Sequence, residues 1–167
     1  MSPTTLLDRD PLTLPVAEVI PHREPFLLLD SVSAGVPGEW VTAHYRVRED
    51  NPVFRGHFPD EPVFPGVLLL ENMAQAACWV MAAAEPGQGG LYVLVRVTQS
   101  TFHQMVRPGD QLETRARLSR RLERFSQFDC EVSVGGHRVA SAELLVSRRD
   151  KAVSAPAPQP AVWREAQ

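Results

Sequence analysis

The sequence lacks an excess of positive charge. Its 167 residues carry 17 Lys+Arg against 20 Asp+Glu, a formal net charge of −3, and the sequence pI is near 5.9. A nucleic-acid-binding domain is expected to show a basic face and a high pI, so this class of function is not indicated. Three short runs are nevertheless basic: RVRED, LSRRLER and SRR. They predict either a solvated surface or a docking patch for an acidic partner protein.

Cysteine is also scarce, with Cys78 and Cys130 alone in the chain. The first lies in an apolar helical run and the second in a strand-like run, so buried free thiols are expected rather than a disulfide framework. The N-terminus is polar and interrupted by proline, and it lacks the basic segment and apolar core of a secretory signal. These features together favour a cytoplasmic protein.

Cofactor and metal motifs are missing as well. The sequence contains no GxGxxG, no P-loop and no internal repeat. Its histidines are dispersed, and none forms an HxH or HExxH pair: His22, His44, His57, His103 and His137. The sequence therefore predicts no bound cofactor and no metal.

The longest apolar run, residues 66–84, is nearly long enough to span a membrane. Glu71, Asn72 and Gln75 lie inside it, and a carboxylate at the bilayer centre costs roughly 2.5–3.5 kcal/mol on insertion scales. Proline flanks the run on both sides. We therefore predict a buried core helix over about 67–84.

The segments around this helix alternate between apolar and polar residues, which is typical of strands with one buried face. The apolar phase of residues 40–47 holds Val41, Ala43, Tyr45 and Val47. The run 111–134 alternates in the same way, with Leu112, Thr114, Ala116 and Leu118 on one face. Residues 91–106 are rich in valine and aromatics, and a Gly-Gly turn at 135–136 leads into a last strand.

One apolar helix among five or six antiparallel strands must be surrounded by them. The simplest arrangement is an α+β hot-dog fold, with a curved antiparallel sheet wrapped around one long central helix. We expect an N-terminal arm over residues 1–14, a single hot-dog domain over 15–150 and a Pro/Ala-rich mobile tail over 151–167.

Glu71 is the single carboxylate inside the predicted helix. Residues four apart share a helix face, so Gln75 is expected beside it. One interpretation is a side chain that reaches solvent or pairs with a cation such as Arg55 or Arg96. The other is a buried acid whose charged form is disfavoured by desolvation, so that it keeps a proton near neutral pH and can donate it.

His57 lies in a Gly-His-Phe-Pro turn. Prolines at 59, 62 and 65 stiffen the backbone around it, which favours a ring held in place over surface decoration. Histidine is the side chain best suited to take a proton at neutral pH.

Gly66 opens the helix, where backbone N–H groups lack intrahelical partners and the dipole adds roughly half a positive charge. Such N–H groups can polarise a carbonyl oxygen, although Pro-Gly is also an ordinary helix start. A base, an acid and an oxyanion site together fit proton abstraction beside a carbonyl and loss of a protonated leaving group, which is a β-elimination.

With these residues in place, the sequence resembles the β-hydroxyacyl-acyl-carrier-protein dehydratases of the FabZ type, which have a hot-dog fold. The resemblance extends over about residues 12 to 149. Four segments carry it, of which the second is the most specific: IPHREPFLLLDSV (20–32), GHFPDEPVFPGVLLLENMAQAA (56–77), VRPGDQL (106–112) and VASAELLV (139–146).

The resemblance implies a role for each matching residue. His57 corresponds to the catalytic histidine, Glu71 to the catalytic carboxylate and Gly66 to the glycine whose amide binds the thioester carbonyl. By the same resemblance, the family's supporting or acyl-tunnel positions are occupied here by Phe58, Phe64, Val67 and Gln75. The resemblance further implies a substrate on the phosphopantetheine arm of acyl carrier protein, and no metal. It also implies an obligatory homodimer, in some members a trimer of dimers, whose protomers share each site.

The sequence also departs from the family pattern. Gln99 and Thr101 stand where a Lys and an Arg are common, and Asn72 stands where a small residue is usual. These changes bear on carrier contact and chain specificity, and the Pro, Ala and Arg usage hints at a polyketide or aryl-polyene pathway. Two alternatives stay open: a hot-dog thioesterase, and a partner subunit of a heteromeric dehydratase with an incomplete site of its own.

Overall fold

The computed structural model describes residues 9–88 and 90–150. The N-terminal part contains two short helical turns, η2 (Pro11–Thr13) and α1 (Val16–Val19), and a third turn, η3 (Pro52–Arg55), precedes the long helix. The remaining elements are β1 (Ser31–Val36), β2 (Trp40–Arg46), α2 (Gly66–Ala84), β3 (Gly90–Phe102), β4 (Gln111–Leu122), β5 (Phe125–Val134) and β6 (His137–Asp150). The predicted tail over 151–167 lies outside the described residues.

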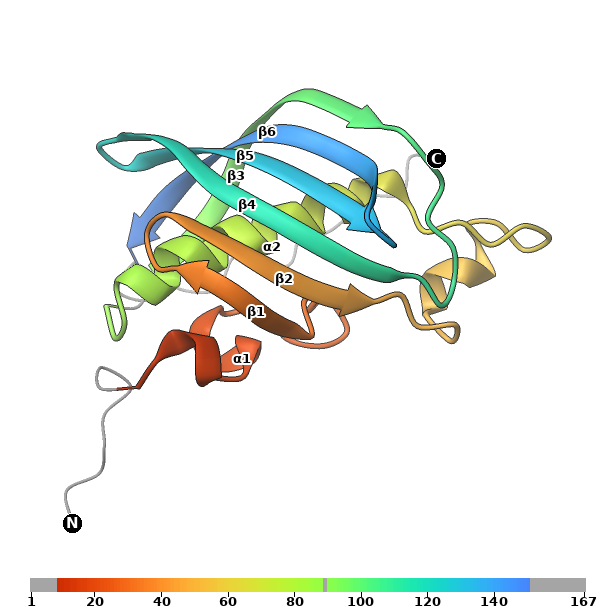
Figure 1. The fold of residues 1–167 in the computed structure, drawn as a ribbon, viewed down its shortest axis with the longest axis horizontal. Coiled ribbons are helices and arrows are strands. Elements are labelled where there is room, and N and C mark those ends of the chain that lie inside the picture. The colour runs from red at the N-terminus through yellow and green to blue at the C-terminus, as the bar shows by residue number, and fades with distance from the viewer. Residues whose placement is uncertain (1–8, 89, 151–167) are drawn as a thin grey trace, which may run out of the picture.

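The six strands form one antiparallel sheet in the order β1-β2-β4-β5-β6-β3. The sheet curves around α2, which runs along its inner face (Figure 1). The predicted hot-dog fold is confirmed. Met73, Ala76 and Trp79 on the helix are fully buried, so the helix fills the space that the sheet encloses.

The predicted strand phases match the buried faces. Val41, Ala43 and Tyr45 of β2 are buried, and they pair with Ala116, Thr114 and Leu112 of β4, which are buried as well. Side chains on the two strands alternate, so this paired row points toward α2 while the charged residues of β4 point outward. The alternating run 111–134 is two strands rather than one, divided by a turn at Glu123–Arg124 where Glu123 has a φ of 48°.

Helix α2 is long and apolar enough to cross a membrane, and it is the one such helix in the described part of the chain. However, 61% of its most apolar stretch is buried inside the fold. The prediction of a core helix is confirmed. The two cysteines are buried and unpaired, as predicted, and burial raises the pKa of the Cys78 thiol to about 12.

Among the described strands, β3 ends the sheet at one side and pairs with β6 alone. Four of its apolar side chains are 37% to 49% exposed: Leu91, Val93, Leu94 and Val95. An open edge with exposed apolar residues is a surface on which another strand can add.

Candidate active site

The His57 ring is held by its own loop. Its Nδ1 lies 2.9 Å from the carbonyl oxygen of Val63, and the Val63 N–H donates to the His57 carbonyl at 3.1 Å. The ring also stacks on Phe58 with 4.1 Å between the ring centroids, across a cis peptide bond. Because a carbonyl accepts only, Nδ1 carries the hydrogen and Nε2 keeps its lone pair. His57 is therefore prepared to act as a base through Nε2.

The loop is anchored to the core through Phe64. Its N–H donates to the carbonyl of Val106 at 2.7 Å, and its ring is 1% exposed. The ring packs against Tyr45 and Phe54, with centroids 6.2 and 6.4 Å away. Phe58 by contrast is 52% exposed. Phe64 therefore anchors the loop to the core. A role of Phe58 or Phe64 in an acyl tunnel stays a prediction.

Glu71 lies one third of the way along α2, and its Oε1 accepts a hydrogen bond from Gln75 Nε2 at 2.9 Å. The expected pairing of Gln75 with Glu71 is thus present. His22 Nε2 lies 3.6 Å from the same oxygen. The side chain of Glu71 keeps 23% exposure, so it is partly rather than fully buried within the single chain. Among the described residues Oε2 has no hydrogen-bond partner, which leaves it available to a substrate.

Buried amides fix this part of the helix. Gln75 Oε1 accepts from Leu28 N at 2.8 Å, and Gln75 Nε2 also donates to Phe26 O at 2.7 Å. Asn72 Nδ2 donates to Leu28 O at 2.6 Å, and its Oδ1 accepts from the Thr114 hydroxyl. Because every polar atom of the Gln75 amide is engaged, its N–H can point at Glu71 in one orientation only.

Gly66 is the first residue of α2, whose N-cap, Pro65, makes no side-chain cap. The N–H groups of Gly66 and Val67 make no hydrogen bond to any described residue, while Leu68 N donates to Pro65 O at 2.9 Å. A Cβ on Gly66 would lie 3.0 Å from the ring of Phe102, which is 48% exposed. Val67 is 69% exposed. The helix start thus presents two free donors beside an apolar surface.

No hydrogen bond or ion pair joins His57 to Glu71 in the described part of the chain. The chain brings Glu71 together with Gln75 and His22, and it places His57 on a separate loop. Neither Arg55 nor Arg96 pairs with Glu71. Sequence reasoning did not single out His22, because its contact with Glu71 spans 49 positions and no local spacing predicts it.

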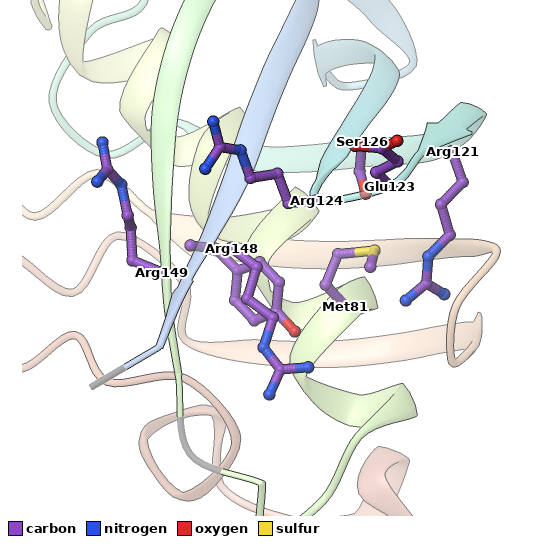
Figure 2. Close-up of a pocket in the computed structure, with 8 residues that line it drawn as sticks. Met81, Arg121, Glu123, Arg124, Ser126, Arg148 and Arg149 are labelled. Carbon is purple, nitrogen blue, oxygen red and sulfur yellow. The ribbon is translucent and has the colours of Figure 1, made fainter. Parts of the chain in front are cut away.

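The other end of α2 carries a pocket of about 390 Å³ with a charged wall. Met81 and Tyr92 are among the residues that line it. Four arginines also line it, Arg121, Arg124, Arg148 and Arg149 (Figure 2). They come from the β4–β5 turn region and the end of β6, which contain the basic runs LSRRLER and SRR. We call these four residues the arginine cluster.

Glu85, at the C-cap of α2, ties part of this cluster to the helix. Its carboxylate accepts from Arg121 at 2.8 Å, from Arg148, and from the Tyr92 hydroxyl at 3.3 Å. Burial and, after it, the Glu85 carboxylate raise the pKa of Tyr92 to about 12. Arg124 lies over the Phe125 ring at 5.3 Å. Glu123 also lines the pocket, but among the described side chains no ion pair joins an acid to Arg124 or Arg149. Four guanidinium groups therefore stand against the carboxylates of Glu85 and Glu123, and the pocket keeps a positive surplus.

The chain is similar in sequence to known proteins. Residues 20–143 match the model of the FabA-like domain family. The chain is 38% identical over 135 residues to the 3-hydroxyacyl-[acyl-carrier-protein] dehydratase FabZ of Psychrobacter arcticus, covering 79% of this chain and 92% of that one. It is 38% identical over 138 residues to the FabZ of Shewanella loihica, covering 81% and 90%.

Solved structures share the fold. A chain of the dehydratase heterocomplex ApeI:P from Xenorhabdus doucetiae superposes with a TM-score of 0.70 at 25% identity, covering 83% of this chain and 93% of that one. A hypothetical thioesterase from Streptococcus pneumoniae, solved with coenzyme A, gives a TM-score of 0.56 at 13% identity, covering 72% and 85%. At that identity the second likeness shows the fold alone.

Proposed function

The chain belongs to the FabA-like domain family, and from this premise we propose that it is a hydro-lyase that dehydrates β-hydroxyacyl thioesters on acyl carrier protein to trans-2-enoyl thioesters. The proposal rests mainly on two side chains that each keep one atom free for proton transfer. His57 Nδ1 is hydrogen-bonded to Val63 O, and Glu71 Oε1 is hydrogen-bonded to Gln75. One is prepared to accept a proton at Nε2 and the other to deliver one from Oε2.

In the proposed reaction His57 Nε2 removes the proton from the carbon next to the thioester carbonyl. The negative charge that develops on the carbonyl oxygen is stabilised by the N–H groups of Gly66 and Val67 at the start of α2. Glu71 Oε2 gives its proton to the β-hydroxyl, the C–O bond breaks and water leaves. The new double bond is conjugated with the thioester. No metal or bound cofactor is required, because the thioester itself acidifies the α-carbon.

We further propose that the active form is a homodimer that pairs through β3. The open edge and the exposed apolar side chains of β3 support this, because covering them removes both unpaired backbone groups and apolar surface from water. The separation of His57 from Glu71 supports it as well, since each site would then take one group from each protomer. In a two-fold, antiparallel β3–β3 pair, Leu91 at one end of the strand lies toward Phe102 of the second copy.

Complementation between inactive variants tests both proposals. His57→Ala and Glu71→Gln should each lower turnover on a β-hydroxyacyl thioester by about 10²- to 10⁴-fold. When the two variants are refolded together in equal amounts, half of the dimers are mixed and each mixed dimer has one intact site, so about a quarter of wild-type turnover should return. Near-normal rates in either single variant would remove the catalytic assignment. If both variants are inactive and do not complement each other, the catalytic roles of His57 and Glu71 would stand, but the proposal of a site shared by two protomers would be overturned.

The arginine cluster is proposed as the contact surface for the carrier protein. Acidic proteins are recognised by clustered guanidinium groups, and the positive surplus at Arg124 and Arg149 stands out in a chain of net charge −3. In the proposed dimer this cluster, which lies beside the Leu91 end of β3, comes toward the helix start of the second protomer. The carrier would thus dock on one protomer and present its thioester to a site shared by both.

Two alternatives are distinguished by simple assays. A hot-dog thioesterase would release a free carrier thiol, which a thiol reagent detects. A partner subunit of a heteromeric dehydratase, for which the ApeI:P heterocomplex is the structural parallel, would be inactive when purified alone and active with its partner. We propose fatty-acid-type synthesis in the cytoplasm as the setting. A polyketide or aryl-polyene pathway, and assembly into a trimer of dimers, stay predictions.

A further inference from the structure

His22 is fixed in place by the chain on both sides of it. The Arg23 guanidinium folds back to donate to the carbonyls of Ile20 at 2.9 Å and His22 at 2.7 Å. A few residues later the buried amides of Gln75 and Asn72 hold Phe26 and Leu28 against α2. The imidazole between these anchors is therefore placed by the fold rather than by chance, and it faces Glu71.

The two nitrogens of His22 have different surroundings. Nε2 lies 3.6 Å from Glu71 Oε1, and both side chains are 23% exposed. Nδ1 is buried and has no hydrogen-bond partner among the described residues. Nδ1 lacks a partner in either neutral tautomer, but a hydrogen on Nε2 faces the Glu71 carboxyl oxygen, so the tautomer with its hydrogen on Nε2 is favoured. Burial lowers the pKa of His22 and Arg23 lowers it further, while Glu71 opposes both. The ring thus presents one neutral N–H to the carboxyl group.

Glu71 Oε1 consequently faces two N–H donors, Gln75 Nε2 at 2.9 Å and His22 Nε2 at 3.6 Å. The first is a hydrogen bond, whereas the second is too long for one until the groups move closer. An oxygen that faces two donors does not itself carry a hydrogen, so the proton of the acid belongs on Oε2.

We propose that His22 is a positioning residue for the acid of the dehydration: its Nε2–H closes on Glu71 Oε1 as the carboxylate forms. This inference rests on the proposed function. In the step, Glu71 Oε2–H gives its proton to the β-hydroxyl oxygen, the C–O bond breaks with its electron pair leaving on that oxygen, and water departs. Negative charge then appears on Glu71, and the Gln75 and His22 N–H groups stabilise it. No proton leaves His22.

Two substitutions to amides distinguish a role of Nε2 of His22 from a role of Nδ1. In His22→Gln the amide nitrogen can occupy the place of Nε2, whereas in His22→Asn the shorter amide reaches only the place of Nδ1. Both are neutral, polar and close in size, so a merely structural role would affect them alike. We expect His22→Asn to lower kcat by about 10- to 100-fold, the worth of one hydrogen bond to a charged group, with KM unchanged. His22→Gln should recover most of that loss.

The readouts are kcat and KM on a β-hydroxyacyl thioester, with thermal melting to show that each variant is folded. His137→Asn, at the exposed start of β6, is the matched control and should behave as wild type. Equal losses in His22→Asn and His22→Gln, no loss in either, or a rise in KM alone would each overturn the inference. A wild-type protein that dehydrates no β-hydroxyacyl thioester would instead overturn the proposed function, so the two failures are distinguishable.

Discussion

The two ends of α2 present opposite surfaces, although they belong to one helix. Near its start, Glu71 meets neutral donors only, Gln75 and His22, and the adjoining surface at Val67 and Phe102 is apolar. At its end, Glu85 is neutralised by Arg121 and Arg148, and the adjoining surface is cationic. Among the described residues, the Glu71 carboxyl group thus keeps one oxygen without a hydrogen-bond partner, whereas the Glu85 carboxylate is fixed between two guanidinium groups.

This difference assigns separate tasks to the two regions. The start of the helix is suited to the chemistry of an uncharged thioester, because it offers donors, an unengaged carboxyl oxygen and apolar contact. The end is suited to a charged macromolecule, because it offers guanidinium groups around a shallow pocket (Figure 2). Substitutions at each end of the helix test this division of tasks.

The sharpest contrast is between the two acids. Glu71→Gln should lower turnover by about 10²- to 10⁴-fold, because Glu71 donates in the reaction. It should change stability little, because among the described residues Glu71 has no cationic partner and His22 beside it is neutral. Glu85→Gln should leave turnover within about twofold and lower the free energy of unfolding by about 1–2 kcal/mol, a modest value because Arg121 is half exposed. Turnover assays measure the activity of both variants, and urea unfolding measures their stability. The reverse pattern would contradict the division of tasks.

A methyl group at the helix start should have the next largest effect. Gly66→Ala places a Cβ about 3.0 Å from the Phe102 ring, which must then move. A misplacement of about one ångström at a reacting site can cost roughly 10²-fold. The ring has to give by less than that, so we expect kcat/KM to fall by about tenfold. Adding Phe102→Leu should restore part of the lost kcat/KM. Steady-state kinetics of the single and double variants measure the loss and the recovery. A loss that the second change leaves untouched would place the effect elsewhere.

Charge reversal in the arginine cluster should affect only the carrier-bound substrate. Arg124→Glu is expected to raise KM for a carrier-protein thioester by about tenfold, more at low salt, and to leave kcat/KM for a small thioester unchanged. Arg138→Glu, on the β5–β6 hairpin, is the control. Equal effects on both substrates would show that the cluster supports the fold or the site rather than docking.

The smallest effect concerns the pH dependence of stability. Burial and Arg23 hold the pKa of His22 below its ordinary value of 6.5, against the pull of Glu71. As pH falls below 6.5 the unfolded chain binds a proton at this position before the folded chain does, so the free energy of unfolding should decline across that window. His22→Gln should lessen the decline. Unfolding curves at several pH values check this, and identical slopes in both proteins would contradict it.

Much of the fold follows from sequence pattern, for identifiable reasons. The alternation in β2 and β4 marks the rows that face α2, and the apolar run 66–84 needs a sheet around it. The break between β4 and β5 is less visible, because Glu123 and Arg124 are not typical turn residues and Glu123 adopts a positive φ. Local pattern carries no signal for a turn that is imposed by the pairing of two long strands.

The site divides in the same way. Local spacing predicts the contact between Glu71 and Gln75, since they lie one turn apart. It cannot predict His22 beside Glu71, nor Thr114 beside Asn72, because these contacts depend on how distant elements pack. Asn72, an unusual residue for its place, is explained by its bonds to Leu28 and Thr114. Glu71, interpreted as either a buried acid or a side chain that reaches solvent, is partly buried in this chain, with 23% exposure.

The most direct test is the mass of a carrier-bound β-hydroxyacyl thioester after incubation with the purified protein. The predicted result is the loss of one water from the acyl group with the thioester bond intact, abolished by His57→Ala and by Glu71→Gln. Release of the free carrier thiol, or an acyl group of unchanged mass under conditions where the protein is dimeric, would contradict the account.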